Sequence, residues 1–436
     1  MSGNSIAGLR GLRVWDSRGR PTVEVAVRLE DGASGRAIAP AGASTGSGEA
    51  TDRRDNGASF GGYDVEGALE AVSSEIAPAL TGIEAADQAT IDARLIELDG
   101  TANRSRLGGN AMIATSMAVA QAAAASAGLP LWRHLLGDAP ALLPLPEIQI
   151  FGGGAHAGRR TDIQDYMIMT PRAESFREAL AITAEVYRAA GERMAETARL
   201  AGVADEGGWW PHFQTNEEAL EELVRAIEQA GYQPGEDVWI SLDIAANEFG
   251  RDGRYQLALD DREIGADAMI ELIESWVSRF PILSIEDPLA EDDFDGAARL
   301  MTRIGQRVQI IGDDLLVTNA NRVHAATEAG AANALLVKVN QAGTVTEAKE
   351  AFDAARAAEW ATIVSARSGE SEDVTIAHLA VGWDAGQFKV GSFARSERMA
   401  KWNEMLRIEG TLGQQARFAG ADGLPVVVRQ RLGHQT

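Results

Sequence analysis

The fold is decided by four stretches of sequence: VWISLDIA (238–245), PILSIEDP (281–288), VQIIGDD (308–314) and ALLVKVN (334–340). Each stretch has the length and the Val, Ile and Leu content of a strand buried on both faces, as in a parallel sheet. Each also ends in a charged side chain, and these are Asp243, Glu286, Asp313 and Lys338. Functional groups gather at the carboxyl ends of the strands in such folds, so the four charges predict a shared site.

The three acids predict a metal site. Carboxylates at the ends of neighbouring buried strands repel one another and lose their hydration, which costs free energy unless a cation lies between them. Asp243, Glu286 and Asp313 supply the oxygen ligands that Mg²⁺ prefers. We therefore expect Mg²⁺ at these strand ends, with Lys338 facing it.

Lysine usage supports a catalytic role for the fourth charge. Of 40 basic residues only four are lysines (338, 349, 389 and 401), and the rest are arginines. A lysine can lose its proton and act as a base, whereas an arginine cannot. Lysines at 338 and 389 in so arginine-rich a chain favour proton-transfer chemistry. The alternative is a lysine that merely extends from a strand end toward water.

Composition restricts the class of protein. A chain of 436 residues with 45% hydrophobic content is long enough for two domains, each with its own core. The net charge of −24 argues against nucleic acid or an anionic membrane as a partner. The absence of cysteine excludes disulfides, thiolate catalysis and Cys-ligated zinc. No signal peptide is expected at the N-terminus, and the alanine-rich stretch 110–128 is expected to be a packed helix, so we expect a soluble cytoplasmic protein.

The two ends of the chain differ in periodicity. TVEVAVRLED (22–31) and SGRAIAP (34–40) alternate with period two, which predicts an antiparallel hairpin with one wet face. Helical patterns follow at 64–80, 86–97 and 108–127. LLPLPEI (142–148) marks the boundary, because its prolines interrupt both helices and strand ladders. We expect an α+β domain over 1–140 and a second domain over 141–436.

Strands and helices alternate in the second domain. Candidate strands begin near 163, 238, 283, 308, 334, 361 and 388. The last four starts are 26, 27 and 27 residues apart, and the gaps hold helical patterns such as TVTEAKEAFDAARAAE (344–359). A nearly constant strand–helix period predicts an α/β fold with a (β/α)8-type barrel. A doubly wound open sheet is the alternative, but no glycine-rich dinucleotide motif follows a first strand.

Long motifs in a fixed order resemble those of the enolase family over essentially the whole chain. They are DSRGRPTVEV (16–25), GASTG (42–46), VADEGG (203–208), SIEDP (284–288), GDDLLVTN (312–319), KVNQAGT (338–344), RSGESED (367–373) and KVGSFARSER (389–398). The resemblance implies a small α+β domain in front of a barrel, two Mg²⁺ ions and a homodimer or higher homo-oligomer. It also implies a carbon–oxygen lyase that interconverts 2-phosphoglycerate and phosphoenolpyruvate.

The resemblance also implies roles for individual residues. The high-affinity Mg²⁺ ligands would be Asp243, Glu286 and Asp313, and Ser44 would bind the second Mg²⁺. Lys338 matches the base that takes the α-proton, and Glu206 matches the acid that helps hydroxide leave; Asp165 is included with these catalytic residues. Arg367 and Ser368 match a phosphate clamp, Lys389 matches a carboxylate contact, and Gln164 and His156 match further substrate contacts.

The chemistry of the implied reaction accounts for this set. A proton α to a carboxylate is very weakly acidic, and its removal places a second negative charge on that carboxylate. Mg²⁺ stabilises this charge, which is the largest electrostatic contribution to such a reaction. We expect the metal and neighbouring cations to lower the pKa of Lys338 toward neutrality, where a base is most effective.

The sequence departs from the family pattern at the mouth of the site. Ala366 stands where enolases have a histidine that assists the acid, and Asp165, after Gln164, is one methylene shorter than the usual glutamate. Other departures are Ala41 in place of serine, the arginines Arg159 and Arg160 after the Gly-Ala-His loop, and the pair Trp209-Trp210 after the DEGG motif. Loops over a fixed scaffold are where new specificity arises.

Three classes of function remain open. The first is an ordinary glycolytic enolase, against which Ala366 stands. The second is a diverged paralogue that acts on a related phosphorylated or phosphonate carboxylate, as do the enolase-like enzymes of phosphonate biosynthesis that form carboxyphosphonoenolpyruvate. In that case Arg159 and Arg160 would bind an extra phosphonate or carboxylate, and Trp209-Trp210 would stack on a base or seal the site. The third is a non-catalytic, enolase-like structural protein.

Overall fold

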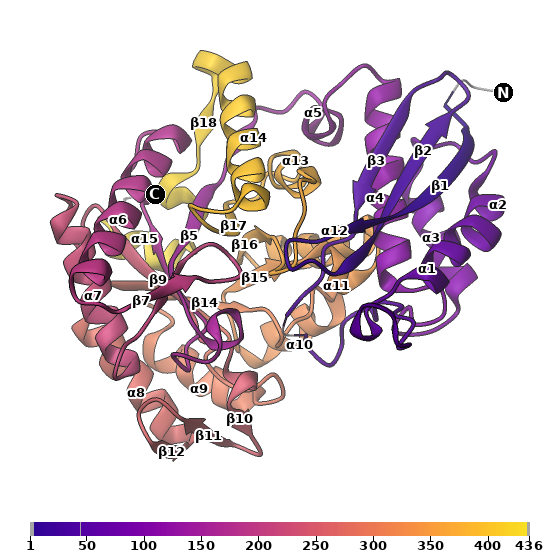
Figure 1. Cartoon of the computed structure of the whole chain (residues 1–436). Coiled ribbons are helices and arrows are strands. Elements are labelled where there is room, and N and C mark those ends of the chain that lie inside the picture. The colour runs from indigo at the N-terminus through magenta and orange to yellow at the C-terminus, as the bar shows by residue number, and fades with distance from the viewer. Residues whose placement is uncertain (1–3, 44, 434–436) are drawn as a thin grey trace.

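A computed structural model describes residues 4–43 and 45–433, and its centre is a closed barrel (Figure 1). The barrel strands are β5 (Leu145–Gly152), β6 (Asp165–Met169), β9 (Trp239–Asp243), β13 (Ile282–Glu286), β14 (Gln309–Gly312), β15 (Ala334–Val337), β16 (Ala361–Ser365) and β17 (Gln387–Ser392). They pair in this order, and β17 pairs with β5 to close the ring. The predicted α/β class with a barrel is confirmed.

Helices surround the strands, as the barrel prediction requires (Figure 1). They are α6 (Phe176–Glu196), α7 (Asn216–Gln229), α8 (Ala266–Arg279), α9 (Phe294–Ile304), α10 (Ala320–Ala329), α12 (Val345–Ala357), α13 (Thr375–Gly382) and α14 (Ser396–Leu412). Side chains cap the start of several of them; the Thr344 hydroxyl, for example, accepts from the backbone N–H of Glu347. Such caps satisfy backbone donors that the first turn leaves free.

Two barrel strands differ from the sequence prediction. Residues 142–148 were expected to be only a boundary, yet β5 begins at Leu145 and includes Pro146. At Pro146 the strand pairs only with β17, because the pairing with β6 begins at Ile148, so the missing N–H of the proline is tolerated. The strand β6 was expected to be parallel, but it runs antiparallel to both β5 and β9.

The reversal of β6 matters for the site. Asp165, the first residue of β6, pairs with Asp243, the last residue of β9. An antiparallel strand presents its start where its neighbours present their ends. The sequence segment Gln164-Asp165 therefore lies at the same end of the barrel as the carboxyl ends of the other strands.

A small α+β unit precedes the barrel, as predicted. Its sheet contains β1 (Ile6–Trp15), β2 (Pro21–Leu29) and β3 (Ser34–Ile38), all antiparallel. The hairpin of β2 and β3 is confirmed, whereas β1 was not predicted. The helices are α1 (Glu66–Ala71), α2 (Ala77–Leu80), α3 (Gln88–Asp99) and α4 (Gly109–Ser126), with a π-turn η2 (Val72–Ile76) between α1 and α2.

The helix α4 packs directly on this sheet. Most of its residues are buried, and a Cβ at Gly35 of β3 would lie 2.2 Å from the carbonyl oxygen of Ala118. The expected packed helix is thus confirmed. Among the residues described, no helix is both long enough and apolar enough to cross a bilayer.

Short elements complete the chain. They are η1 (Ser59–Gly62), α5 (Leu131–Leu136), β4 (Leu142–Leu143), η3 (Gly154–Ala157), β7 (Leu200–Val203), β8 (Trp209–Pro211), η4 (Ala246–Glu248), β10 (Gly250–Arg251), β11 (Arg254–Leu257), β12 (Arg262–Gly265), α11 (Val339–Ala342), η5 (Gly413–Gln415), β18 (Arg417–Phe418), η6 (Gly420–Gly423) and α15 (Val426–Arg431). The strands β7 and β8 extend the barrel sheet beyond β5, and the loop between them carries Glu206.

Candidate active site

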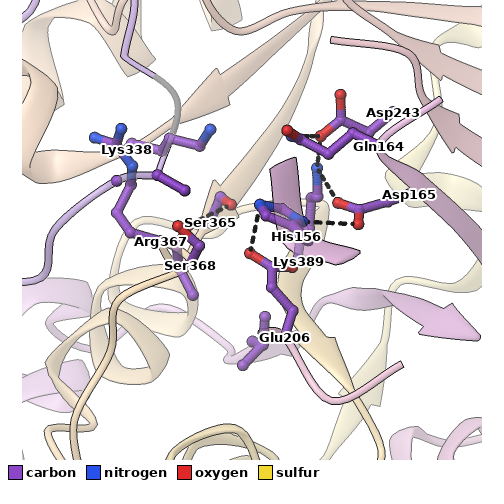
Figure 2. Close-up of a pocket in the computed structure, with 14 residues that line it drawn as sticks. His156, Gln164, Asp165, Glu206, Asp243, Lys338, Ser365, Arg367, Ser368 and Lys389 are labelled. Atoms are coloured by element: carbon purple, nitrogen blue, oxygen red, sulfur yellow. Dashed lines mark hydrogen bonds and ion pairs between the residues drawn. The ribbon is translucent and has the colours of Figure 1, made fainter. Parts of the chain in front are cut away.

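The charged strand ends lie at one end of the barrel, where Asp243 and Lys338 line a cavity together with loop residues (Figure 2). Glu286 and Asp313 are not among the lining residues of this cavity. Predicted site residues that line this cavity are His156, Gln164, Asp165, Glu206, Asp243, Lys338, Arg367, Ser368 and Lys389. Glu286 is paired in register with Asp243, and Asp313 directly follows the next strand, β14. The predicted metal ligand Ser44 lies outside the described residues.

Lys389 lies between two of the expected metal ligands. Its Nζ is 2.9 Å from Asp243 Oδ2 and 2.7 Å from Glu286 Oε2. Burial lowers the pKa of Lys389, but the adjacent carboxylates of Asp243 and Glu286 outweigh burial and raise it well above its usual value. Burial likewise raises the pKa of Asp243, and Lys389 and Lys338 reverse this, so that the Asp243 pKa is low. This lysine is therefore a fixed cation of the site.

Lys338 forms an ion pair with Asp313. Burial lowers the pKa of Lys338, but Asp313 raises it further, so the net pKa is above its usual value. The charge of Asp313 acts on the Lys338 ammonium, which is the electrostatic reason for the raised pKa. The lowered pKa expected from the sequence depends on bound metal and stays a prediction.

Several buried oxygens in the site have no hydrogen-bond partner within the described part of the chain. They are Gln164 Oε1, Asp165 Oδ2 and Glu286 Oε1. Buried polar atoms are nearly always satisfied in folded proteins, so unsatisfied oxygens at this density indicate a position for a cation or a ligand. Burial, followed by the charge of Asp243, raises the pKa of Glu286 well above its usual value, so the site is short of positive charge. Oxygen donors of this kind fit Mg²⁺.

Two groups of described residues are close enough together to share a cation. One contains His156, Asp165 and Glu206, and the other contains Asp287, Asp313 and Asp314. Asp243 and Glu286 belong to neither group; each of them forms an ion pair with the Lys389 ammonium. The sequence analysis overlooked Asp287, which accepts hydrogen bonds from the backbone N–H groups of Asp313 (2.9 Å) and Asp314 (2.6 Å). Because Asp287 directly follows Glu286, its place in the sequence could have identified it as a further acid of the site.

His156 connects the two predicted acids. Its Nδ1 is 3.0 Å from Asp165 Oδ1, and its Nε2 is 3.9 Å from Glu206 Oε1. Burial lowers the pKa of His156, but Asp165 and Glu206 reverse this and raise it to about 9. The imidazole is therefore protonated at neutral pH, and it can hold a proton beside Glu206.

Gln149 supports this group and was not predicted. Its amide donates to Asp165 Oδ1, and its Oε1 accepts from the backbone N–H of Gly208 at 2.8 Å. Gln149 lies on β5, the strand that the prolines concealed in the sequence. It links the Asp165 carboxylate to the loop that carries Glu206.

The expected phosphate clamp is held by a buried acid. Arg367 donates from Nη1 to Glu49 Oε2 at 2.9 Å and from Nη2 to Glu49 Oε1 at 3.2 Å. Arg398 donates to the backbone carbonyls of Arg367 (2.6 Å) and Ser368 and thereby fixes this loop. The sequence analysis had not included Glu49. Figure 2 shows Arg367, Ser368 and Lys338 on one side of the cavity, and Asp165 and Glu206 on the other.

The departures from the family pattern take different positions. Ala366 and Val390 line the cavity and form an apolar section of its wall. Arg159 and Arg160 do not line it: Arg159 forms an ion pair with Glu248 at 2.7 Å, and Arg160 Nη1 lies 3.2 Å from His212 Nδ1.

The tryptophan pair and Ala41 also lie outside the wall of the cavity. Trp209 stacks on Tyr187 with ring centroids 4.6 Å apart and donates to the Tyr187 carbonyl at 2.8 Å. Its indole therefore packs on the helix α6. Trp210 packs against Gly158, where an added Cβ would lie 3.0 Å from the indole. Ala41 forms a backbone bridge with Gly369.

The site defines a class of barrel proteins with acids, lysines and a buried arginine gathered at the carboxyl ends of the strands. Comparison with protein families agrees. Residues 140–426 match the enolase C-terminal TIM barrel domain, and residues 6–135 match the enolase N-terminal domain. The chain therefore belongs to the enolase family.

Proposed function

We propose that this protein is a Mg²⁺-dependent enzyme that removes the α-proton of a 2-phosphoglycerate-like carboxylate. The observation that carries the proposal is the placement of Lys338 and of the His156–Asp165–Glu206 group on opposite sides of one cavity (Figure 2). A base on one face of the substrate and an acid on the other are what elimination requires. Arg367 and Ser368, on the Lys338 side, would bind the phosphoryl group.

The residues of the chain account for the proton transfers. Lys338 Nζ accepts the α-proton, and the electron pair of the C–H bond moves toward the carboxylate as the enediolate forms. When that pair returns to form the C=C bond, the C3–O bond breaks, and the proton from Glu206 converts the departing hydroxide to water. His156, protonated and next to Glu206, stabilises the Glu206 carboxylate that remains. Lys389 lies on the carboxylate side and opposes the growing negative charge.

Mg²⁺ would be held by Asp243, Glu286 and Asp313, and it would supply positive charge that opposes protonation of Lys338 and stabilises the second negative charge on the substrate. The fit rests on the unsatisfied buried oxygens of this site. Family membership supports the same metal chemistry.

We further propose that the enzyme is a paralogue whose substrate differs from that of an ordinary enolase. The supporting observation is the position of Ala366 in the cavity wall, where its side chain offers no donor to a leaving group. The acidic, cysteine-free composition fits a cytoplasmic enzyme. A homodimer or higher homo-oligomer is proposed because family membership supports oligomerisation.

Exchange of the substrate α-proton with deuterated solvent tests the proposal. With 2-phosphoglycerate and Mg²⁺, Lys338→Arg keeps the charge but cannot accept a proton, so exchange should stop. Glu206→Gln should slow elimination and leave exchange measurable, because the acid acts only on the leaving group. Lys349→Arg, a change on the outer helix α12, is the matched control and should exchange like the wild type. Equal exchange by the wild type and the Lys338 variant would exclude Lys338 as the base.

A further inference from the structure

A second cavity adjoins the active site. It measures about 370 Å³, and Gly42 lines both cavities. Its wall comes from the N-terminal unit, mainly from the loops on either side of β2 and β3, together with Asn340 from the barrel. The catalytic roles assigned above do not use this space.

Three arginines line the cavity, against two acids. The arginines are Arg18, Arg20 and Arg54, and the acids are Glu49 and Asp52. Glu49 is already neutralised by Arg367, and Asp52 forms an ion pair with Arg54 at 2.8 Å. Arg18 Nε lies 3.9 Å from Asp16 Oδ2, so among the described arginines of this wall the charge left unbalanced is that of Arg20. The cavity therefore has an excess of positive charge in a protein whose net charge is −24.

Arg20 carries the unbalanced charge. Its guanidinium stacks on the ring of Tyr63 at 4.1 Å, and no carboxylate of the described residues forms an ion pair with it. Arg54 fixes this platform, because its Nη1 donates to the carbonyls of Pro21 at 2.6 Å and of Tyr63 at 3.1 Å. A guanidinium that is held in place by stacking and has free donors is preorganised to bind an anion.

Arg18 connects this cavity to the expected phosphate clamp. Its Nη2 donates to the carbonyls of Ala41 (2.8 Å) and Gly42 (3.1 Å), and its Nη1 reaches the Ser368 hydroxyl at 3.5 Å. Ser368 is one of the two residues of the clamp. An anionic group next to Ser368 would therefore adjoin Arg18, which also lines the second cavity.

We propose that this cavity binds a second anionic group, a carboxylate or a phosphonate, that is attached to the phosphoryl end of the substrate. The proposal rests on the proposed function, since it extends the substrate of the same site. Arg20, which Arg18 links to the clamp, would bind the extra anionic group that was expected to contact Arg159 and Arg160. Arg20 is the residue that sets specificity for the larger substrate.

Three small ligands test the proposal by isothermal titration calorimetry with Mg²⁺ present. Ethylphosphonate carries one anionic group, whereas phosphonoacetate and 3-phosphonopropionate carry a carboxylate one and two carbons from the phosphonate. The wild type should bind at least one of the latter two about tenfold more tightly than ethylphosphonate, as a charge-assisted contact to Arg20 requires. Arg20→Gln should lose most of this preference and keep its affinity for ethylphosphonate.

Two further variants make the result specific. Arg20→Lys retains the charge and should keep part of the preference, which also shows that position 20 tolerates substitution. Arg36→Gln removes an exposed arginine of β3 that pairs with Glu24 at 3.6 Å, and it should behave like the wild type. Equal affinity of the wild type for all three ligands, absence of binding, or an unchanged preference in Arg20→Gln would each overturn the proposal. Because binding needs no turnover, these outcomes are independent of the α-proton exchange that tests the proposed function.

Discussion

At the scale of single residues, Ala366 decides between an ordinary and a rebuilt active site. The family's histidine assists the acid during loss of hydroxide, and alanine has no polar group. Dehydration of 2-phosphoglycerate by the wild type should therefore be slower than that of ordinary enolases, on the order of a hundredfold or more. The ultraviolet absorbance of phosphoenolpyruvate measures this directly.

The activity of the reversion Ala366→His shows whether the site has lost only one catalytic group or has changed throughout the pocket. If the pocket is rebuilt for a larger substrate, the reversion should restore less than about a tenth of the missing activity, since the Arg20 cavity remains. Ala357→His, at an exposed position of the outer helix α12, controls for the addition of an imidazole. A wild-type turnover equal to that of ordinary enolases would contradict this prediction and favour the glycolytic function.

A second residue, Glu147, makes stability depend on pH. It lies on β5 inside the barrel, where Ser241 and Gln309 donate to it at 3.3 Å each, and the catalytic roles do not use it. Burial raises the pKa of Glu147 from 4.5 to about 7. The folded state thus holds a proton that the unfolded state releases above pH 4.5, so this carboxyl lowers the free energy of unfolding as pH rises from 4.5 to about 7.

Glu147→Gln removes this pH dependence while keeping the shape of the side chain. At pH 8 the variant should be more stable than the wild type by on the order of 2 kcal/mol in free energy of unfolding. At pH 5 this difference in stability should be small. Urea unfolding at the two pH values gives the difference. Glu350→Gln, on the outer helix α12, is the control. A gain of equal size at both pH values would mean that Glu147 is ionised in the folded state throughout.

At the scale of elements, the contact between β3 and α4 supports the base. The helix α4 packs on the sheet through Gly35, and its Ser116 hydroxyl accepts from the backbone N–H of Val345, at the start of α12. The segment between β15 and α12 includes Lys338 and α11. The close approach at Gly35 therefore fixes the N-terminal unit against the part of the barrel that carries the base.

Gly35→Ala should break that approach. The new Cβ would lie 2.2 Å from a backbone oxygen, so α4 must move, at a cost of about 1–3 kcal/mol. Gly8→Ala on β1 is the matched control, because a Cβ added at Gly8 would have no neighbour within 4 Å. Thermal unfolding should show a drop of several degrees for the first variant and almost none for the second. Equal melting temperatures would show that the helix has room to move.

At the scale of the whole molecule, Mg²⁺ should stabilise the fold. A ligand that binds only the folded state raises the melting temperature, and here it would relieve repulsion among buried acids. Asp313→Asn should abolish the rise that Mg²⁺ produces in the wild type. Asp353→Asn, whose carboxylate pairs with Lys349 at 2.6 Å on the surface of α12, should keep it. A full Mg²⁺-dependent shift in Asp313→Asn would place the metal elsewhere.

The sequence by itself determined the barrel class, the hairpin and most of the polar residues that line the cavity, because apolar runs and sequence motifs are local features of the chain. Buried parallel strands read as apolar runs, and their charged ends lie at one end of the barrel by topology. Only the tertiary structure decided which charges meet. The reversed β6, the strand β5 with Pro146, and the pairing of Glu49 with Arg367 depend on contacts between distant segments. The same holds for Arg159, which pairs with Glu248 outside the cavity, and for Arg20, which lines the second cavity. The direction of a surface side chain depends on its neighbours in space, and the periodicity of the sequence carries no information about those neighbours.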